Sequence, residues 1–305
     1  MDNVLNGLHS NPLFEAGCRA SSCNPQPPAA SAHQAPKGNV LHEIVKNKSA
    51  ELERSKSSMP LRKLRALCRD RTQGPRDFSG AIRRQGRLSI IAEIKMASPS
   101  SGRIVSGKGY ADMARAYQGS GFANAISAVT ERRYFGGELG SIEAIKGAVS
   151  LPVLRKDFIV DEYQIYESYA AGADAILLIA AILDRATLKG FIEIAEGLGM
   201  PCLVETHDAP QIDRALSAGA KIIGINSRDL GDFSIDKDLF GSLAPRIPQG
   251  VTRVAESGIE TAEDSRRLRR AGADAILVGT SLLKASDIAA KLREIAGIDG
   301  RRGNC

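Results

Sequence analysis

Charged and polar side chains stand at the ends of several apolar runs in this chain. Strand alternation places these groups on the same face as the apolar residues before them. The set comprises Glu93, Lys95, Lys156, Glu205, Asn226, Arg228 and Glu256. Acids and bases crowded into a partly dehydrated mouth shift one another's pKa, which makes a carboxyl or an ammonium a useful proton donor near neutral pH. One charged strand end could simply cap the next helix, but the whole set favours general acid/base catalysis.

Two turns of small residues add a candidate anion site. Ser257-Gly258 follows one apolar run and precedes a helix expected to open at Glu260-Thr261, and Gly279-Thr280-Ser281 follows the final run and is expected to open the last helix. Glycine lets the backbone approach a ligand, and the N–H groups at a helix start point toward an anion. The two turns predict a phosphate site.

A sequence motif that recurs along the chain indicates the helices and strands that position these residues. AGADAILLI at Ala171–Ile179 returns as AGADAILVG at Ala271–Gly279, with weaker copies at Ser217–Ile225 and Gly119–Val129. Each copy indicates a helix ended by glycine, a short turn and a buried strand. Further strand-like runs lie at 88–95, 153–156, 202–205 and 252–256. Eight strands alternating with helices predict an α/β fold, the (β/α)8 TIM barrel, whose strand ends form the active site. The doubly wound alternative lacks its Gly-rich nucleotide turn here.

The chain is predicted to consist of one domain with a tail at each end. Residues 1–38 hold five prolines and only four charges, a composition that predicts a disordered tail. Residues 39–295 are expected to form a single barrel domain that includes an N-terminal extension, since Leu41, Ile44, Val45 and Leu52, and then Leu61, Leu64 and Leu67, recur at helical spacing. Residues 296–305 are expected to be a C-terminal tail.

Composition excludes several classes of protein. No apolar run reaches the roughly 18 residues of a membrane helix, and the charge of +6 comes with 5% aromatic residues and no Trp, so neither membrane nor nucleic acid is an expected partner. The basic face of Arg266, Arg267, Arg269 and Arg270 is expected to be solvated. The five cysteines show no metal-type pairing and indicate free thiols in a reducing compartment. We expect a cytoplasmic protein, with organelle targeting by the tail left open.

Six motifs resemble one family closely, the indole-3-glycerol phosphate synthases of tryptophan biosynthesis. The likeness runs from about Val40 to Leu292, through IAEIKMASPSSG, LPVLRKDFIVDEYQIYE, LVETHD, GINSRDL, VAESGI and LVGTSLL. The resemblance implies a lyase that closes the ring of 1-(2-carboxyphenylamino)-1-deoxyribulose 5-phosphate, with loss of carbon dioxide and water. It implies no metal and no organic cofactor. A monomer or weak homo-oligomer is expected, with contact to neighbouring tryptophan-pathway enzymes left open.

The resemblance also implies roles for individual residues. Lys156 resembles the general acid that polarises the substrate ketone, and Lys95 the group that binds the substrate carboxylate, with assistance in dehydration left open. Glu205 would act as acid and base in dehydration, with Glu93 as its partner acid. The remaining matches would hold the substrate: Asn226, Glu256 and Ser257 at the sugar hydroxyls, Arg228 beside the anion, Ser98, Gly258, Gly279 and Thr280 at the phosphate, and Phe135, Phe158 and Leu178 around the aromatic ring.

A few residues depart from the family pattern or are expected to have structural roles, and two competing functions remain. Ala128-Val129 departs from the family pattern and is expected to enlarge the pocket, and Met96-Ala97 removes a positive charge. His207 is expected to serve the loop or a cap, and Asp161 with Gln164 to open a helix. An aldolase-like enzyme that uses Lys156 as a Schiff-base nucleophile, and a non-catalytic barrel that binds anions, are the competing functions.

Overall fold

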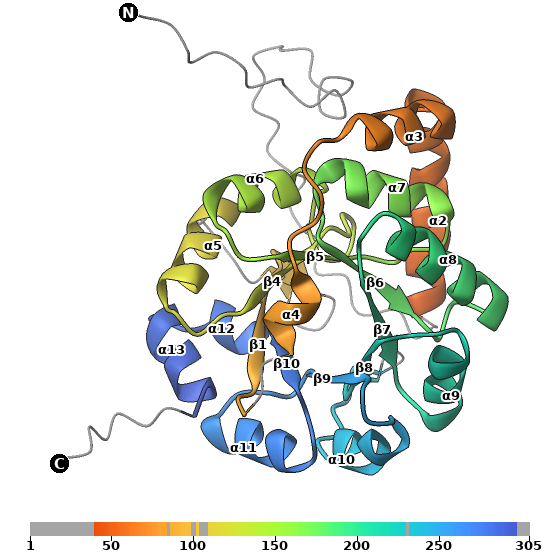
Figure 1. The fold of residues 1–305 in the computed structure, drawn as a ribbon. Helices are drawn as coiled ribbons and strands as arrows, with labels where there is room; N and C mark the ends of the chain where they lie inside the picture. Colours follow the sequence, from red (N-terminus) through yellow and green to blue (C-terminus); the bar gives the residue numbers. More distant parts are fainter. Residues whose placement is uncertain (1–39, 84–85, 99–101, 104–108, 230–231, 298–305) are drawn as a thin grey trace, which may run out of the picture.

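The chain forms a closed barrel of eight parallel strands ringed by helices (Figure 1). The computed structural model describes residues 40–83, 86–98, 102–103, 109–229 and 232–297. Around the barrel the strand order is β1-β10-β9-β8-β7-β6-β5-β4. The strands are β1 (Ser89–Ile94), β4 (Ala125–Val129), β5 (Val153–Lys156), β6 (Ala175–Ile179), β7 (Cys202–Thr206), β8 (Ile222–Asn226), β9 (Thr252–Glu256) and β10 (Ala275–Val278). The predicted (β/α)8 barrel and its eight strands are confirmed.

Helices follow the barrel strands β4 to β10 or precede β4, and they lie along the outside. They are α5 (Tyr110–Gly119), α6 (Gly140–Ala148), α7 (Glu162–Ala171), α8 (Arg185–Gly197), α9 (Ala209–Ser217), α10 (Leu239–Leu243), α11 (Ala262–Arg270), α12 (Thr280–Leu283) and α13 (Ile288–Ile295). A short antiparallel pair, β2 (Ala97–Ser98) and β3 (Gly102–Arg103), follows β1. The 3-10 turn η1 (Ala244–Arg246) extends α10. The prediction that Gly279 opens the last helix was wrong: it opens the four-residue α12, and Asp287 then caps α13.

Alternation along each strand divides the apolar residues into two clusters. On β6, Leu177 and Ile179 belong to the cluster inside the barrel, whereas Ile176 and Leu178 pack outward against the helices. The inner cluster includes Phe78 and Ile82 of α4 (Phe78–Ile82), both fully buried. Because side chains fill the barrel, the inward residues available for chemistry are those at the strand ends.

The repeated phrase has a structural cause at the amino ends of the strands. The marker glycines all adopt a left-handed backbone, with φ of +74° at Gly121, +97° at Gly172, +92° at Gly219 and +93° at Gly272. The Asp174 carboxylate then accepts the Val153 amide at 2.8 Å. Asp274 accepts the Arg253 amide at 2.8 Å in the same way, and the Asn124 side chain accepts that of Ile90 at 2.9 Å. The GAD phrase therefore marks a clamp between adjacent strands.

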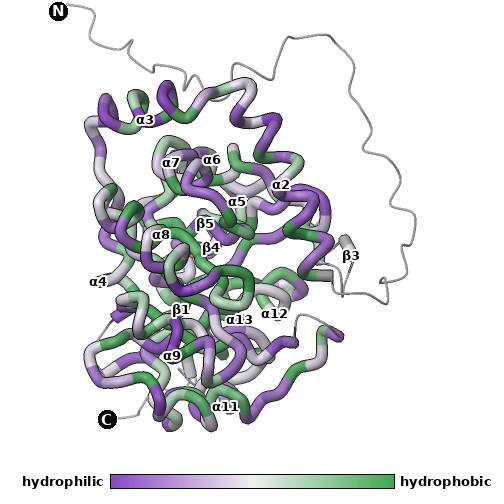
Figure 2. The backbone as a smooth tube through the Cα atoms, turned by 90° about the vertical axis from the view of Figure 1, so that its right-hand side faces the viewer, coloured by the Kyte–Doolittle hydropathy of each residue, from purple (hydrophilic) through white to green (hydrophobic). Residues whose placement is uncertain are grey.

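Two helices before the barrel form the predicted N-terminal extension. They are α2 (Val40–Ser58) and α3 (Leu61–Asp70), and Figure 2 shows long hydrophilic stretches in both, as expected for helices that bury only one face. Leu52 and Leu64 pack with Tyr163 of α7 in a small separate cluster. Ile44 of α2 instead joins the cluster inside the barrel. The predicted tail at 1–38 and most of 296–305 lie outside the described residues, so the predicted domain boundaries stay predictions.

Candidate active site

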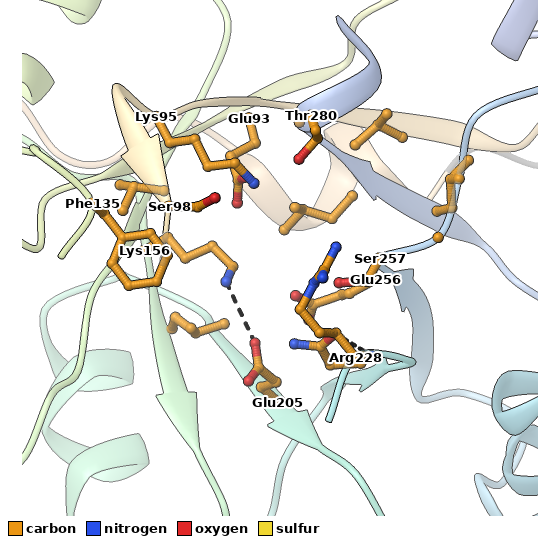
Figure 3. Close-up of a pocket in the computed structure, with 18 of the residues that line it drawn as sticks. Glu93, Lys95, Ser98, Phe135, Lys156, Glu205, Arg228, Glu256, Ser257 and Thr280 are labelled. Atoms are coloured by element: carbon orange, nitrogen blue, oxygen red, sulfur yellow. Dashed lines mark hydrogen bonds and ion pairs between the residues drawn. The ribbon is translucent and has the colours of Figure 1, made fainter. Parts of the chain in front are cut away.

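A cavity opens where the strands end at their carboxyl edges, and it collects the residues that the sequence singled out (Figure 3). Its empty space is about 1180 Å³ with the mouth included, which is on the scale of the ~300–1000 Å³ pockets that hold small molecules. All seven predicted strand-end groups line it. So do seven of the eight other predicted site residues: Ser98, Phe135, Phe158, Ser257, Gly258, Gly279 and Thr280.

The exception is Leu178, which does not line the cavity. It packs in the outer cluster against the helices, and its neighbours Leu177 and Ile179 line the cavity instead. The prediction chose the wrong face of β6, and a shift of one residue moves a side chain to the opposite side of a strand. Ala128 also faces outward while Val129 lines the cavity, so Ala128 does not enlarge the pocket.

Lys156 ends β5 and points into the middle of the cavity. Its Nζ lies 3.5 Å from Oε2 of Glu205 (Figure 3). Burial lowers the pKa of Lys156, but the carboxylates of Glu205, Glu93 and Glu256 outweigh burial and raise it above its ordinary value. Lys156 is therefore held as an ammonium ion. A charged ammonium can donate a proton, whereas a Schiff-base nucleophile needs a neutral amine with a depressed pKa.

Glu93 and Lys95 leave β1 on the same face and form a close pair. Lys95 Nζ lies 2.7 Å from Glu93 Oε1. Burial would raise the pKa of Glu93, but Lys95 and then Lys156 hold it below its usual value. This pair supplies a charged carboxylate and a cation on the side of the mouth opposite Glu205 (Figure 3).

Glu205 of β7 and Glu256 of β9 are both buried and are driven to opposite protonation states. For Glu205, burial is outweighed by Lys156 and His207, and its pKa lies below its usual value. For Glu256, burial and the negative charge of Glu205 raise the pKa well above its usual value. Neither oxygen of Glu256 has a hydrogen-bond partner among the described residues. Two carboxyls with separated pKa values are the arrangement that general acid/base catalysis requires.

The turns after β9 and β10 hold the backbone close to the cavity. Ser257 and Gly258 both adopt left-handed conformations, with φ of +68° and +70°. Such a conformation is strained for a serine and is typical of functional sites. Gly279 precedes the first turn of α12, whose Thr280 lines the cavity. The predicted helix opening at Glu260-Thr261 is confirmed within one residue, because Thr261 caps α11.

Aromatic rings form the apolar wall of the cavity. The ring centroids of Phe135 and Phe158 lie 6.3 Å apart, with their planes tilted by 35°. The Glu131 carboxylate accepts the backbone amides of Tyr134 at 2.7 Å and Phe135 at 3.0 Å. Glu131 thus orders the loop that carries one of the two rings.

Sequence reasoning missed several residues of the cavity. Asp157, Phe233 and Ile235 line it as well. Asp157 directly follows Lys156, so its position was an available signal. Its partner was not, because Asp157 Oδ1 lies 3.0 Å from Nζ of Lys48 on the distant helix α2. Phe233 and Ile235 lie in a loop that has no periodicity to reveal them.

His207 touches the site in a way that the loop prediction did not include. Its backbone amide donates to Gln211 of α9 at 3.0 Å, which serves the loop as expected. Its ring Nε2 also lies 3.6 Å from Oε1 of Glu205, and among the described residues neither ring nitrogen has a hydrogen-bond partner. His207 therefore adds to the electrostatic environment of Glu205.

Two further predictions concern residues outside the cavity, the helix opening at Asp161 and the basic face of α11. Asp161 caps α7 by accepting the Tyr163 amide at 2.8 Å. The four arginines of α11 lie near acids or carbonyl groups of neighbouring segments: Arg266 and Arg270 at Glu263, Arg267 at the carbonyl of Lys237 and Arg269 at the carbonyl of Gly86. No helix in the described part of the chain is long and apolar enough to cross a membrane.

Known proteins match the chain over the same region. A family model described as indole-3-glycerol phosphate synthase matches residues 41–295. The indole-3-glycerol phosphate synthase of Mycolicibacterium vanbaalenii is 44% identical over 248 residues, which are 81% of this chain and 90% of that protein. The enzyme of the same name from Mycobacterium avium is 42% identical over 256 residues, 84% of this chain and 93% of that protein.

A solved structure matches the fold alone. The 3-hexulose-6-phosphate synthase of Salmonella typhimurium superposes with a TM-score of 0.55 at 17% identity, covering 68% of this chain and 97% of that chain. It supports the barrel architecture. The family match spans the strands, the turns and all the polar groups of the cavity, and this chain belongs to the indole-3-glycerol phosphate synthase family.

Proposed function

We propose that this protein is a carboxy-lyase that converts 1-(2-carboxyphenylamino)-1-deoxyribulose 5-phosphate to indole-3-glycerol phosphate, carbon dioxide and water. Membership of the family supports the reaction. The observation that carries the mechanism is the ammonium of Lys156, held charged at the centre of the cavity by the carboxylates of Glu205 and Glu93. No resident metal or organic cofactor takes part in the proposal.

Ring closure begins at the substrate ketone. Lys156 donates a proton to the ketone oxygen as the aromatic carbon that bears the carboxylate attacks the carbonyl carbon. The carboxylate then leaves as carbon dioxide, and its electron pair restores the aromatic ring. Lys95 binds the carboxylate before it leaves, and Phe135 with Phe158 holds the ring, which lies in their apolar wall.

Dehydration follows at the new alcohol. Its hydroxyl leaves as water after receiving a proton, and a base removes a proton from the adjacent carbon. Glu205 is the acid and base of this step, with Glu93 as partner acid. Both carboxylates face the cavity and are ionised at rest, so each takes up a proton before it donates one, Glu205 from the adjacent carbon and Glu93 from solvent. Asn226, Glu256 and Ser257 hold the sugar hydroxyls and Arg228 lies beside the anion. The reaction as a whole takes up one proton for each turnover.

The phosphate occupies the turns after β9 and β10. Gly258, Gly279 and Thr280 contact it from these turns and Ser98 contacts it from β2, and all four residues line the cavity. We further propose that the protein works in the cytoplasm and is a monomer or weak homo-oligomer. Light scattering on the full chain tests the oligomeric state. Light scattering on mixtures of this protein with neighbouring enzymes of the tryptophan pathway tests whether they associate.

The test supplies the substrate to the full-length protein and follows the fluorescence of the indole product. Turnover is expected, with uptake of one proton per product, and it is expected to collapse in Glu205→Gln. A well-folded wild-type protein without turnover would overturn the proposal.

The competing Schiff-base chemistry has its own readout. Borohydride would trap a covalent adduct between Lys156 and a sugar phosphate if the amine were a nucleophile. We expect no adduct, because the surrounding carboxylates keep Lys156 protonated. A trapped adduct at Lys156 would replace the acid role with the aldolase-like one.

A further inference from the structure

Gly224 of β8 occupies a place in the barrel that no side chain could share. A Cβ atom built on it would lie 2.1 Å from Oε1 of Glu256, 3.2 Å from its Cδ and 3.3 Å from Cδ1 of Leu203. Carbon atoms in ordinary contact are about 3.5–4.0 Å apart. The carboxyl group of Glu256 therefore fills the volume that any other residue at position 224 would need.

Strand register shows that Glu256 reaches back into the barrel to take this place. Asn226 is the partner of Glu256 across β8 and β9, and Gly224 is the partner of Val254, one inward position deeper. On its other side Gly224 is the partner of Glu205 on β7. Gly224 thus lies between the two acids, and its missing side chain leaves the space that the Glu256 carboxyl occupies.

The surroundings of the Glu256 carboxyl are unusual for a buried acid. Both of its oxygens are inaccessible and have no hydrogen-bond partner among the described residues. The charged groups that act on it come from three other strands: Glu205 on β7, Lys156 on β5 and Glu93 on β1. A buried carboxyl without donors and with two acids nearby is favoured in its neutral form.

We propose that Gly224 is a positioning residue, which makes room for the carboxyl of Glu256 inside the barrel beside Glu205, so that Glu205 is the acid of the pair that faces the substrate as a carboxylate. The inference rests on the proposed function, in which Glu205 is the acid and base of dehydration. A larger residue at 224 would push Glu256 out toward the substrate and leave Glu205 without its neutral neighbour.

The same arrangement recurs two strands further along the barrel. A Cβ on Gly279, at the end of β10, would lie 2.4 Å from Oε1 of Glu93 on the adjacent strand β1. Two of the acids in the mouth therefore lie over glycines of neighbouring strands. Gly279 also belongs to the proposed phosphate turn, so Gly224 gives the cleaner test.

The test is a double-mutant cycle of Gly224→Ala and Glu256→Ala in the full-length protein. In the wild-type background, Gly224→Ala is expected to lower kcat/KM roughly tenfold or more, because contacting residues couple strongly. In the Glu256→Ala background the same change is expected to cost little, because the methyl group then has room. Gly190→Ala in α8, where a Cβ meets nothing within 4 Å, is the matched control and is expected to leave activity unchanged.

Two further readouts separate positioning from a general loss of structure. The acid limb of the kcat/KM profile should move to higher pH in Gly224→Ala, because Glu205 loses a neighbour that favours its charged form. The thermal stabilities of the four proteins should show the same coupling, and they are measurable even if the wild-type protein does not turn over the proposed substrate. If Gly224→Ala does not fold alone, the double variant should fold.

The outcomes are distinct. Equal losses of activity and stability from Gly224→Ala in both backgrounds would overturn the inference while leaving the proposed function intact. If the folded wild-type protein shows no turnover but the thermal stabilities of the four proteins are coupled, the proposed function is overturned, and the inference that Gly224 positions Glu256 is kept.

Discussion

Asp174 at the amino ends of the strands and Glu256 at their carboxyl ends are both buried acids, but their surroundings differ completely. Asp174 accepts the amides of Val153 at 2.8 Å and Arg76 at 2.6 Å and also pairs with Lys146. Glu256 has no hydrogen-bond partner among the described residues. The acid at the amino end has its hydrogen bonds satisfied internally and adds to stability, whereas the acid at the carboxyl end is left for a substrate, as functional sites are at the expense of stability.

The largest expected effect comes from exchanging the lysine at each end. Lys156→Met should lower kcat/KM by roughly 10²–10⁴-fold, the usual contribution of a general acid. The matched variant Lys146→Met removes the partner of Asp174 at the other end and should leave kcat/KM unchanged while lowering the denaturant midpoint. Steady-state kinetics and urea unfolding of both variants measure the two effects. A comparable loss of activity in Lys146→Met would end the division between the two ends.

Removing the acid at the amino end should cost stability instead of activity. Asp174→Ala leaves two amides and the Lys146 ammonium without their acceptor, and breaking such a buried charged network costs about 3–5 kcal/mol. Asp274→Ala is the matched change, because its carboxylate is half-buried and accepts the Arg253 amide. A single lost hydrogen bond should cost about 1 kcal/mol. Chemical unfolding compares the pair, and equal losses would show that the extra partners of Asp174 contribute nothing.

At the carboxyl end, the raised pKa of Glu256 gives stability a definite pH dependence. Above its ordinary value of 4.5 the unfolded chain ionises Glu256, while the folded protein keeps it neutral. The folded state then binds more protons, so this group lowers stability as pH rises from about 4.5 toward its raised pKa. Glu256→Gln removes the effect. Its stability relative to wild type should increase with pH across that window, measured by thermal unfolding, and a difference independent of pH would contradict the assignment.

The comparison also explains what could be predicted from the sequence. The barrel was predictable because the repeated phrase combines a glycine that ends a helix with the buried strand that follows it, and eight such strands can be counted. The clamp made by the acid of the GAD phrase appears only in the structure. The strand-end groups were predictable because alternation with apolar residues reveals their face. Leu178 was assigned to the cavity by resemblance alone, and the sequence could not correct it, because a run in which every residue is apolar carries no alternation to show which face is inward.

Contacts between distant segments were beyond sequence reasoning. Nothing near Asp157 indicates that Lys48 of α2 is its partner. The role of Gly224 depends on the reach of a side chain from the next strand, which requires the register of β8 and β9. Such features arise from tertiary packing alone, and they concentrate at the carboxyl end, where seven strand-end groups converge on one cavity.

The smallest effect tests whether the amino-end clamp can be extended. Register places Lys221 opposite Cys202, as Asp174 lies opposite Val153 and Asp274 opposite Arg253. Lys221 cannot accept an amide with its side chain, so this fourth copy of the phrase lacks the clamp. Lys221→Asp should supply it and stabilise the protein by about 1 kcal/mol, the net contribution of one hydrogen bond.

The control is Lys221→Ala, because both variants lose the exposed pair of Lys221 with Glu196, which contributes about 0–1 kcal/mol. Thermal and urea unfolding should rank the aspartate variant above the alanine variant, with kcat/KM the same in both. If the two variants are equally stable, the acid of the GAD phrase does not act through the clamp, and the stability of the amino end must come from the left-handed glycine and the apolar residues that follow it.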